Sequence, residues 1–341
     1  MRYSMIAAAF VAATAGTAQA QEVTLRVHHF LSSDAPIQTG VLGPWEKMVE
    51  EQSEGRIDVQ IYPSMQLGGK PPQLFDQARD GVVDVAWTLL GYTPGRFPKS
   101  EVFELPFMSA SASATTAALQ PYQEKYLGDE LADVHPLMLH APAAYKLHLK
   151  DVSVSSMADL EGLKLRTPSR TMTDGLQALG ATAVGMPVPQ VPQALTTGVI
   201  DGAVIPWEVS GSLRIESVAQ NHTEFGAENG GLSTSVMALV MNKGVYEGLP
   251  DDLKKVIDDN SGAALAEMAG TAFDEAELRE RQKAVDAGHE IVVIPEADLA
   301  AWKEASQPVI DAWVQAMTDA GHDGAAMLSD AEAMLQSAQG Q

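Results

Sequence analysis

Charged and aromatic side chains follow the apolar segments of this sequence, where the strands of an α/β protein would end. Arg166 lies near the end of the segment Leu163–Thr167, and Tyr92 follows the apolar run Val82–Leu90. Ligands of α/β proteins bind outside the carboxyl ends of the parallel strands. A guanidinium group can hold a carboxylate by two parallel hydrogen bonds. Arg166 at such a position would therefore make the site select an anion.

Other strand-end positions hold side chains that could bind an apolar ligand body. Phe30 follows the first predicted strand, and Pro206 and Trp207 follow a later one. Each residue also has a purely structural interpretation: a salt bridge for Arg166, which is the commoner role of such a charge, and packing between lobes for Tyr92 and Trp207. The residues alone leave both interpretations open.

The motifs of the common catalytic centres do not occur in the sequence. It contains no G-x-G-x-x-G, G-x-x-x-x-G-K-[ST], H-E-x-x-H or G-x-S-x-G. The only His pair, His28 and His29, lies on a predicted strand, where neighbouring side chains point to opposite faces. With 0 Cys, thiolate metal sites and disulfides are excluded. We expect no catalytic residue, no metal site and no cofactor.

The composition is that of a globular protein with a strongly acidic surface. The 341 residues are 45% hydrophobic and 20% charged, with 22 Lys and Arg against 45 Asp and Glu. The formal net charge of −23 gives a negative field. Such a field repels the phosphates of nucleic acids and anionic membranes, so we expect neither as a partner.

The N-terminus has the pattern of a secretory signal peptide. Arg2 precedes an apolar stretch, Met5–Ala13, and the segment ends with Ala18-Gln19-Ala20. The apolar stretch is too short to span a bilayer, so we expect no direct membrane insertion. We expect residues 1–20 to be removed and the mature protein, beginning at Gln21, to be located in a bacterial periplasm.

The first hundred residues predict a β-α-β-α-β order, which is typical of a parallel sheet flanked by helices. The predicted elements are the strand Val23–Val27, the helix Pro44–Glu54, the strand Ile57–Ile61, the helix Pro71–Asp80 and the strand Val82–Leu90.

A second region repeats this alternation. Its predicted elements are the strand Leu163–Thr167, the helices Thr171–Leu179 and Val188–Thr197, and the strand Gly198–Ile205. The two regions share a local pattern, since Gly81-Val-Val-Asp84 and Gly198-Val-Ile-Asp201 each place a glycine and then an aspartate between a helix and a strand. We infer two topologically related α/β lobes.

A long helical stretch, Pro250–Ala287, follows a strand within Leu232–Asn242. A helix of this length would be on the order of 50 Å long, so we expect it to contact both lobes, with possible bends at Gly262 and Gly270. We expect lobe I to contain residues 21–143 and 232–270, and lobe II to contain 144–231 and 271–341.

Several motifs resemble those of one family, the DctP-type periplasmic solute-binding proteins of TRAP transporters. In the second lobe they are Met157–Pro168, Leu179–Thr182, Met186-Pro187 and Ala194–Gly202 with Pro206; in the first lobe they are Leu67-Gly68-Gly69, Gly81–Asp84 and Leu105-Pro106-Phe107. The resemblance covers nearly the whole chain after residue 20. It implies a two-lobed periplasmic binding protein fold that closes around its ligand and delivers it to TRAP membrane subunits.

The resemblance also implies roles for particular residues. Arg166 matches the arginine that pairs with the ligand carboxylate, and Lys146 takes a second basic position where arginine is typical. Ile205 replaces an asparagine, Val188 replaces an aromatic residue, and Gln190 replaces a glutamate. These departures argue against a sugar acid, which needs polar partners.

The combined prediction is a binding protein for a small organic monocarboxylate with an aromatic, hydroxy-acid or keto-acid body. Arg166, Lys146 and Arg170 are the expected basic residues of the site, and the expected wall is formed by Phe30, Tyr92, Tyr145, Pro206 and Trp207. Two alternatives remain: a binding protein for an amine or zwitterion, and an exported enzyme on a two-lobed scaffold.

Overall fold

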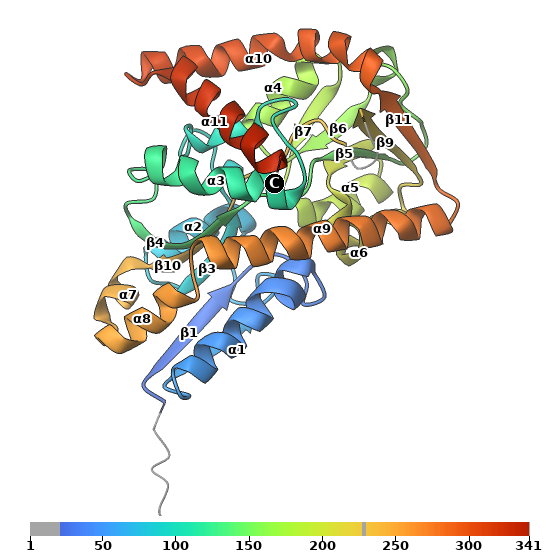
Figure 1. Cartoon of the computed structure of the whole chain (residues 1–341). Helices are drawn as coiled ribbons and strands as arrows, with labels where there is room; N and C mark the ends of the chain where they lie inside the picture. Colours follow the sequence, from blue (N-terminus) through green and yellow to red (C-terminus); the bar gives the residue numbers. More distant parts are fainter. Residues whose placement is uncertain (1–20, 227–229, 341) are drawn as a thin grey trace, which may run out of the picture.

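The chain forms two α/β lobes that lie side by side and are connected by the long helix α9 (Ala263–Asp286), as Figure 1 shows. This computed structural model describes residues 21–226 and 230–340. The expected signal peptide, residues 1–20, lies outside the described residues. The predicted two-lobed α/β fold is thus present.

The first lobe is built on a sheet with the strand order β2-β1-β3-β10-β4. Its strands are β1 (Val23–His28), β2 (Ile57–Tyr62), β3 (Val85–Leu89), β4 (Val134–His140) and β10 (Met237–Asn242). Strand β3 is buried at every position, and Leu25 and Val27 of β1 are fully buried. This matches the apolar run and the alternating pattern from which the two strands were predicted.

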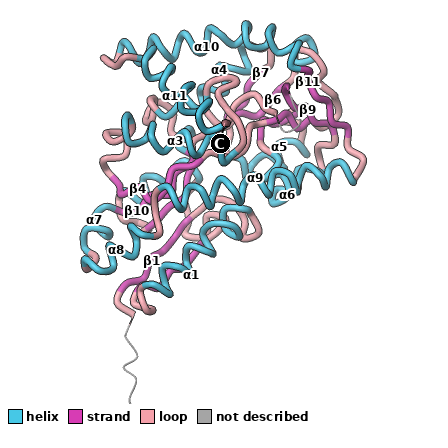
Figure 2. The backbone as a smooth tube through the Cα atoms, in the orientation of Figure 1, coloured by secondary structure: helices cyan, strands magenta, loops and turns pink. Residues whose placement is uncertain are grey.

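The second lobe is built on a sheet with the strand order β11-β9-β5-β8-β6-β7. Its strands are β5 (Lys146–Leu149), β6 (Lys164–Thr167), β7 (Thr182–Gly185), β8 (Gly202–Ile205), β9 (Asn221–Gly226) and β11 (Glu290–Pro295). The two groups of strands are separate in Figure 2, where they are drawn in magenta.

The sheets are mixed, whereas the sequence predicted parallel ones. Strands β1, β2 and β3 pair in parallel, as do β6, β7 and β8. However, β10 is antiparallel to β3 and β4, and β5 is antiparallel to β8 and β9. The reason is that β5 and β10 receive the chain from the other lobe. They start at the boundary between the lobes, where β3 and β8 end.

Helices cover both sheets (Figure 1). They are α1 (Gly43–Gln52), α2 (Leu74–Arg79), α3 (Ala112–Tyr126), α4 (Arg170–Ala178), α5 (Val191–Thr196), α6 (Trp207–Leu213), α7 (Lys243–Gly248), α8 (Asp251–Asp259), α9, α10 (Leu299–Asp319) and α11 (Gly324–Gln339). No helix in the described part of the chain is long and apolar enough to span a lipid bilayer.

The predicted helix over Pro250–Ala287 is divided into α8 and α9. The break lies at residues 260–262, where Gly262 has φ +67° and donates a backbone hydrogen bond of 2.6 Å to Leu137 O. Helix α9 still contacts both lobes, because it packs against α3 and β4 on one side and α6 on the other. Its 24 residues correspond to about 36 Å.

The C-terminal helices depart from the predicted division of the chain. Helix α10 packs against α4 in the second lobe, but α11 packs against α3 in the first. The segment 271–341 therefore contacts both lobes, whereas the sequence predicts it in lobe II alone. The remaining lobe boundaries stay predictions.

A row of histidines connects the core of the second lobe with its surface. His148 Nε2 lies 3.2 Å from Ile205 O, His148 Nδ1 lies 2.9 Å from His222 Nδ1, and His222 Nε2 lies 3.0 Å from His289 Nδ1. A carbonyl can only accept, so His148 Nε2 carries the proton. With His148 and His222 neutral, His222 Nδ1 then donates to His148 Nδ1, and His289 Nδ1 donates to His222 Nε2. Burial lowers the pKa of His148, and lowers that of His222 to about 3.

Gly270 lies within the continuous helix α9 and allows close packing between α9 and α3. A Cβ atom there would lie 2.7 Å from Ser113 Cα. We predict that Gly270→Leu lowers the free energy of unfolding by about 1–3 kcal/mol, because α9 must move away from α3. Gly128→Leu is the control, because a Cβ there meets open space. Equal midpoints of urea unfolding for the two variants would contradict this role.

The histidine row predicts a loss of stability in acid. The unfolded chain binds a proton at His222 near pH 6.5, whereas the folded protein does so only at about pH 3. The free energy of unfolding should therefore decrease as the pH falls through this window. We predict that the slope between pH 6 and 4 is smaller in His222→Gln, by about 1.4 kcal/mol per pH unit. Parallel wild-type and variant curves in urea titrations would refute it.

Candidate ligand-binding site

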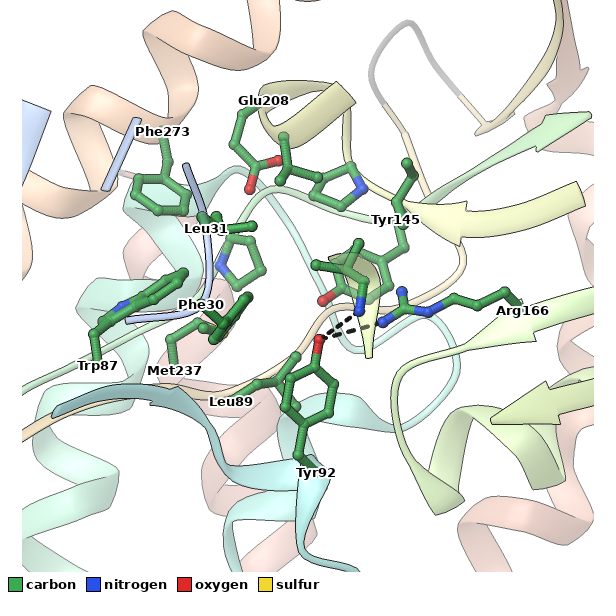
Figure 3. Close-up of a pocket in the computed structure, with 15 residues that line it drawn as sticks. Phe30, Leu31, Trp87, Leu89, Tyr92, Tyr145, Arg166, Glu208, Met237 and Phe273 are labelled. Carbon is green, nitrogen blue, oxygen red and sulfur yellow. Dashed lines mark hydrogen bonds between the residues drawn. The ribbon is translucent and has the colours of Figure 1, made fainter. Parts of the chain in front are cut away.

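A cavity lies between the two lobes, where the strands β3, β6 and β8 end and β5 and β10 begin. Its empty volume, which includes the space at its open side, is about 370 Å³, and it is shown in Figure 3. Its lining is mostly apolar and aromatic, with one basic and one acidic side chain. The lining residues are Phe30, Leu31, Trp87, Leu89, Tyr92, Pro142, Tyr145, Arg166, Val188, Ile205, Pro206, Glu208, Val209, Met237 and Phe273.

The strand ends bring five of the eight predicted site residues to this cavity. Arg166 lies on β6, Tyr92 follows β3, Phe30 follows β1, Tyr145 precedes β5 and Pro206 follows β8. The sequence argument placed ligands at the carboxyl ends of parallel strands. The cavity lies at the carboxyl ends of the parallel strands of both lobes, and the strand ends of one lobe face those of the other.

Arg166 is buried and its described partners are all neutral. The residue is only 1% exposed. Nε donates to Met186 O at 2.9 Å, Nη1 donates to Val204 O at 3.0 Å, and Nη2 lies 3.5 Å from Tyr92 Oη. No acidic side chain among the described residues forms an ion pair with it, and burial lowers its pKa. The salt-bridge interpretation of Arg166 therefore has no support in the described structure.

These contacts leave the guanidinium ready for an anion. It has five N–H donors, and the three contacts with Met186, Val204 and Tyr92 use three of them. A buried charge without a counter-charge costs several kcal/mol, and a carboxylate in the cavity would remove most of that cost. The arrangement can hold a monoanion at this end of the cavity.

Tyr92 connects the two lobes across the cavity. It belongs to the first lobe, but its hydroxyl oxygen accepts a hydrogen bond of 2.9 Å from the backbone N–H of Val188 in the second lobe and lies beside Arg166. Burial raises the pKa of Tyr92, so the phenol stays protonated. Its own O–H proton remains able to donate to a ligand bound by Arg166.

Aromatic rings form a flat wall in the first lobe. Phe30 stacks on Trp87 with a centroid distance of 4.8 Å and an interplanar angle of 23°, and Tyr92 is tilted against Phe30 at 5.6 Å. All three are less than 10% exposed. Such rings favour a planar apolar ligand body by stacking and edge-to-face contacts.

Glu208 is a cavity residue that the sequence analysis missed. It lies two positions after Pro206, at the start of α6, and is 4% exposed. Its Oε2 atom is buried and has no hydrogen-bond partner among the described residues. Burial, and then the nearby Glu277, raise the pKa of Glu208 well above its usual value. Its position just beyond the end of a strand could have indicated a role in the site. However, acidic residues are so common in this sequence that Glu208 does not stand out.

Lys146, a predicted ligand residue, does not line the cavity. Its ammonium group donates to Ala144 O at 2.6 Å and forms a buried ion pair with Glu277 of α9. The physical reason is that successive residues of a strand point to opposite faces. Tyr145 points into the cavity, so Lys146 points away from it.

Trp207 and Arg170 also lie away from the cavity. The indole N–H of Trp207 donates to Glu224 Oε1 at 2.9 Å, and its ring packs against His148 in the second lobe. Arg170 has a side chain 70% exposed and lies 3.8 Å from Asp174 on the same helix. It lines a shallow outer groove beside Tyr92. These contacts of Trp207 agree with its interpretation as a packing residue.

Comparison with known proteins identifies the family. Residues 27–316 match the model of the bacterial extracellular solute-binding proteins, family 7. A curated relative, the C4-dicarboxylate-binding periplasmic protein DctP of Rhodobacter capsulatus, is 27% identical over 86% of this chain and 87% of its own length.

Two solved structures are similar over most of their lengths. One is a TRAP solute-binding protein from a marine metagenome, specific for aromatic acid ligands and in complex with metahydroxyphenylacetate, with 46% identity, TM-score 0.90 and coverage of 93% of this chain and 99% of that one. The other is a TRAP solute-binding protein from Rhodoferax ferrireducens with copurified benzoate, with 41% identity, TM-score 0.90 and coverage of 93% and 98%. The family model spans most of the chain, and the chain therefore belongs to the DctP-type solute-binding proteins of TRAP transporters.

Proposed function

We propose that the protein binds a small aromatic monocarboxylate between its lobes and delivers it to TRAP membrane subunits. The observation that carries this proposal is the buried guanidinium of Arg166, which has only neutral partners in the described structure. The ligand carboxylate would supply the missing negative charge, and the remaining N–H donors would bind it.

The walls of the cavity favour an aromatic body over a sugar acid. Beside Arg166, the second lobe contributes Val188, Ile205 and Val209, which have no polar side-chain atoms. A sugar acid would leave its hydroxyl groups unpaired against these residues, at a cost for each group. The stacked rings of Phe30 and Trp87 instead offer a surface for a planar ring.

The similar proteins support the same ligand class. The marine protein was solved with metahydroxyphenylacetate and with 3-hydroxybenzoate, and the Rhodoferax protein with benzoate. The lining of the cavity is mainly aromatic and aliphatic, with one guanidinium and one carboxyl group. Such a lining suits an aromatic acid with a single carboxylate better than an anion with several charges.

Closure of the lobes completes the proposed site. The hydrogen bond from Val188 N to Tyr92 Oη joins the lobes beside Arg166, so ligand binding and closure share the same groups. Exclusion of water strengthens the attraction between guanidinium and carboxylate. Because the protein as a whole is negative, this short-range attraction has to overcome the general repulsion of anions, which salt screens beyond about 8 Å.

We further propose that residues 1–20 direct export to the periplasm and that the protein binds its ligand without turning it over. The cavity lining of the described chain includes no Ser, Thr or His side chain that could form a nucleophile–base pair. The function of a carrier requires release of the ligand unchanged.

Replacement of Arg166 should abolish tight binding. We predict that Arg166→Ala weakens benzoate binding by about 30-fold to several thousand-fold, because loss of one partner of a buried charge pair costs about 2–5 kcal/mol. Isothermal titration calorimetry measures the change. Arg279→Ala, at an exposed position on α9, is the matched control.

Two further measurements separate loss of charge pairing from loss of folding. Benzamide, which has the shape of benzoate but no charge, should not bind to the wild type at millimolar concentration. Circular dichroism should show that Arg166→Ala is folded. Unchanged benzoate affinity in a folded Arg166→Ala protein would remove the basis of the proposal.

Replacement of Tyr92 tests its role between the lobes. Tyr92→Phe keeps the ring against Phe30 but removes the oxygen that bonds Val188 N and faces Arg166. We predict benzoate binding about 5- to 50-fold weaker, since a hydrogen bond near a charged group contributes about 1–2.5 kcal/mol. Dissociation should be faster in stopped-flow fluorescence, because the closed form is less stable. An unchanged dissociation rate would show that this contact does not hold the lobes together.

A further inference from the structure

Glu208 approaches the cavity from a different side than Arg166. In Figure 3 the Glu208 carboxyl group enters from above, Arg166 from the right and Tyr92 from below, with the Tyr145 ring between Glu208 and Arg166. The two ionisable groups come from different elements, because Glu208 lies on α6 and Arg166 on β6. Because both side chains line the same cavity, an acid bound to Arg166 shares its space with Glu208.

The charges around Glu208 are already balanced without it. On α9, Glu277 Oε1 pairs with the Lys146 ammonium group of β5, and Glu277 Oε2 accepts a hydrogen bond of 2.9 Å from the Glu208 backbone N–H. Lys146 is therefore neutralised by Glu277 and not by Glu208. A second carboxylate here would be buried, unpaired and next to a like charge, so the neutral acid is favoured.

A neutral carboxylic acid has a proton to donate. Oε2 of Glu208 is buried and has no hydrogen-bond partner in the described parts of the chain, and the cavity lining contains no other carboxyl, amide or imidazole side chain that could accept its proton. An unpaired polar group in an apolar site costs free energy, and a ligand oxygen that accepts its proton removes that cost.

We propose that Glu208, as the protonated acid, donates a hydrogen bond to a hydroxyl group on the ring of the bound acid and so selects hydroxylated aromatic acids over unsubstituted ones. The inference rests on the proposed function, because Arg166 has to fix the carboxylate before the opposite end of the ring has a defined position. An ammonium group is the alternative occupant. It requires an ionised Glu208, which the nearby Glu277 disfavours.

The test compares ligands that differ only at the ring. Isothermal titration calorimetry of the wild type is done with benzoate, 3-hydroxybenzoate, 4-hydroxybenzoate and the zwitterion 3-(aminomethyl)benzoate. We expect the better hydroxybenzoate to bind about tenfold or more tightly than benzoate, which corresponds to one well-placed hydrogen bond. Tightest binding of the aminomethyl compound would overturn the proposal in favour of an ionised Glu208.

Variants then assign the preference to the side chain. Glu208→Leu and Glu208→Met remove the donor, so the ratio of hydroxybenzoate affinity to benzoate affinity, measured within each variant, should shrink to about twofold or less. Glu208→Gln retains an N–H donor and should keep most of the preference. Two apolar variants are included so that the test can still be made if one of them does not fold. A preference that survives in a folded apolar variant would overturn the role of Glu208.

Control measurements separate this inference from the function on which it depends. Glu130→Gln replaces a half-buried acid that lies outside the cavity and accepts a hydrogen bond from Lys99 N, and it should leave all affinities unchanged. If the wild type binds none of the four acids, the proposed function fails. If benzoate binds through Arg166 but the hydroxyl group adds nothing, only the role of Glu208 fails.

Discussion

The site depends on one uncompensated positive charge. Arg166 is held by two backbone carbonyls and faces a phenol, so protein groups fix its orientation without cancelling its charge. Neutral acceptors are suited to this task, because a carboxylate of the protein would compete with the ligand. The ion pair between Lys146 and Glu277 shows the contrast, since there a buried cation has its own acid and takes no part in the cavity.

The sheets explain how the two lobes build one site. Strands that end at the boundary contribute Arg166 and Tyr92, and strands that begin there contribute Tyr145 and Met237. Because both sheets face the boundary with their strand ends, each lobe supplies part of the lining and neither encloses the cavity alone. The proposed recognition of a ring hydroxyl by Glu208 extends the same principle, since α6 starts directly after β8.

The sequence allowed prediction of the two lobes, the main strands and the position of Arg166, because apolar periodicity and strand-end rules depend on local residues. It did not allow prediction of the side on which Lys146 lies, since that depends on the register of the short strand β5, whose alternation is hidden in a fully buried segment. The antiparallel β5 and β10 were missed because strand direction depends on where the chain crosses between lobes. Glu208 was missed because its proposed role depends on a carboxyl oxygen without a hydrogen-bond partner in the described structure. A sequence does not show which hydrogen bonds are formed.

Helix α9 has a mechanical consequence for the whole molecule. It is packed against α3 in one lobe and α6 in the other, and the chain also crosses between the lobes before β5 and before β10. Sliding or rotation of one lobe about its own axis would shear several connections at once, whereas bending would deform them only slightly. The molecule should therefore have one soft mode, a hinge-like opening between the lobes, and release of a bound ligand would require motion along that single coordinate.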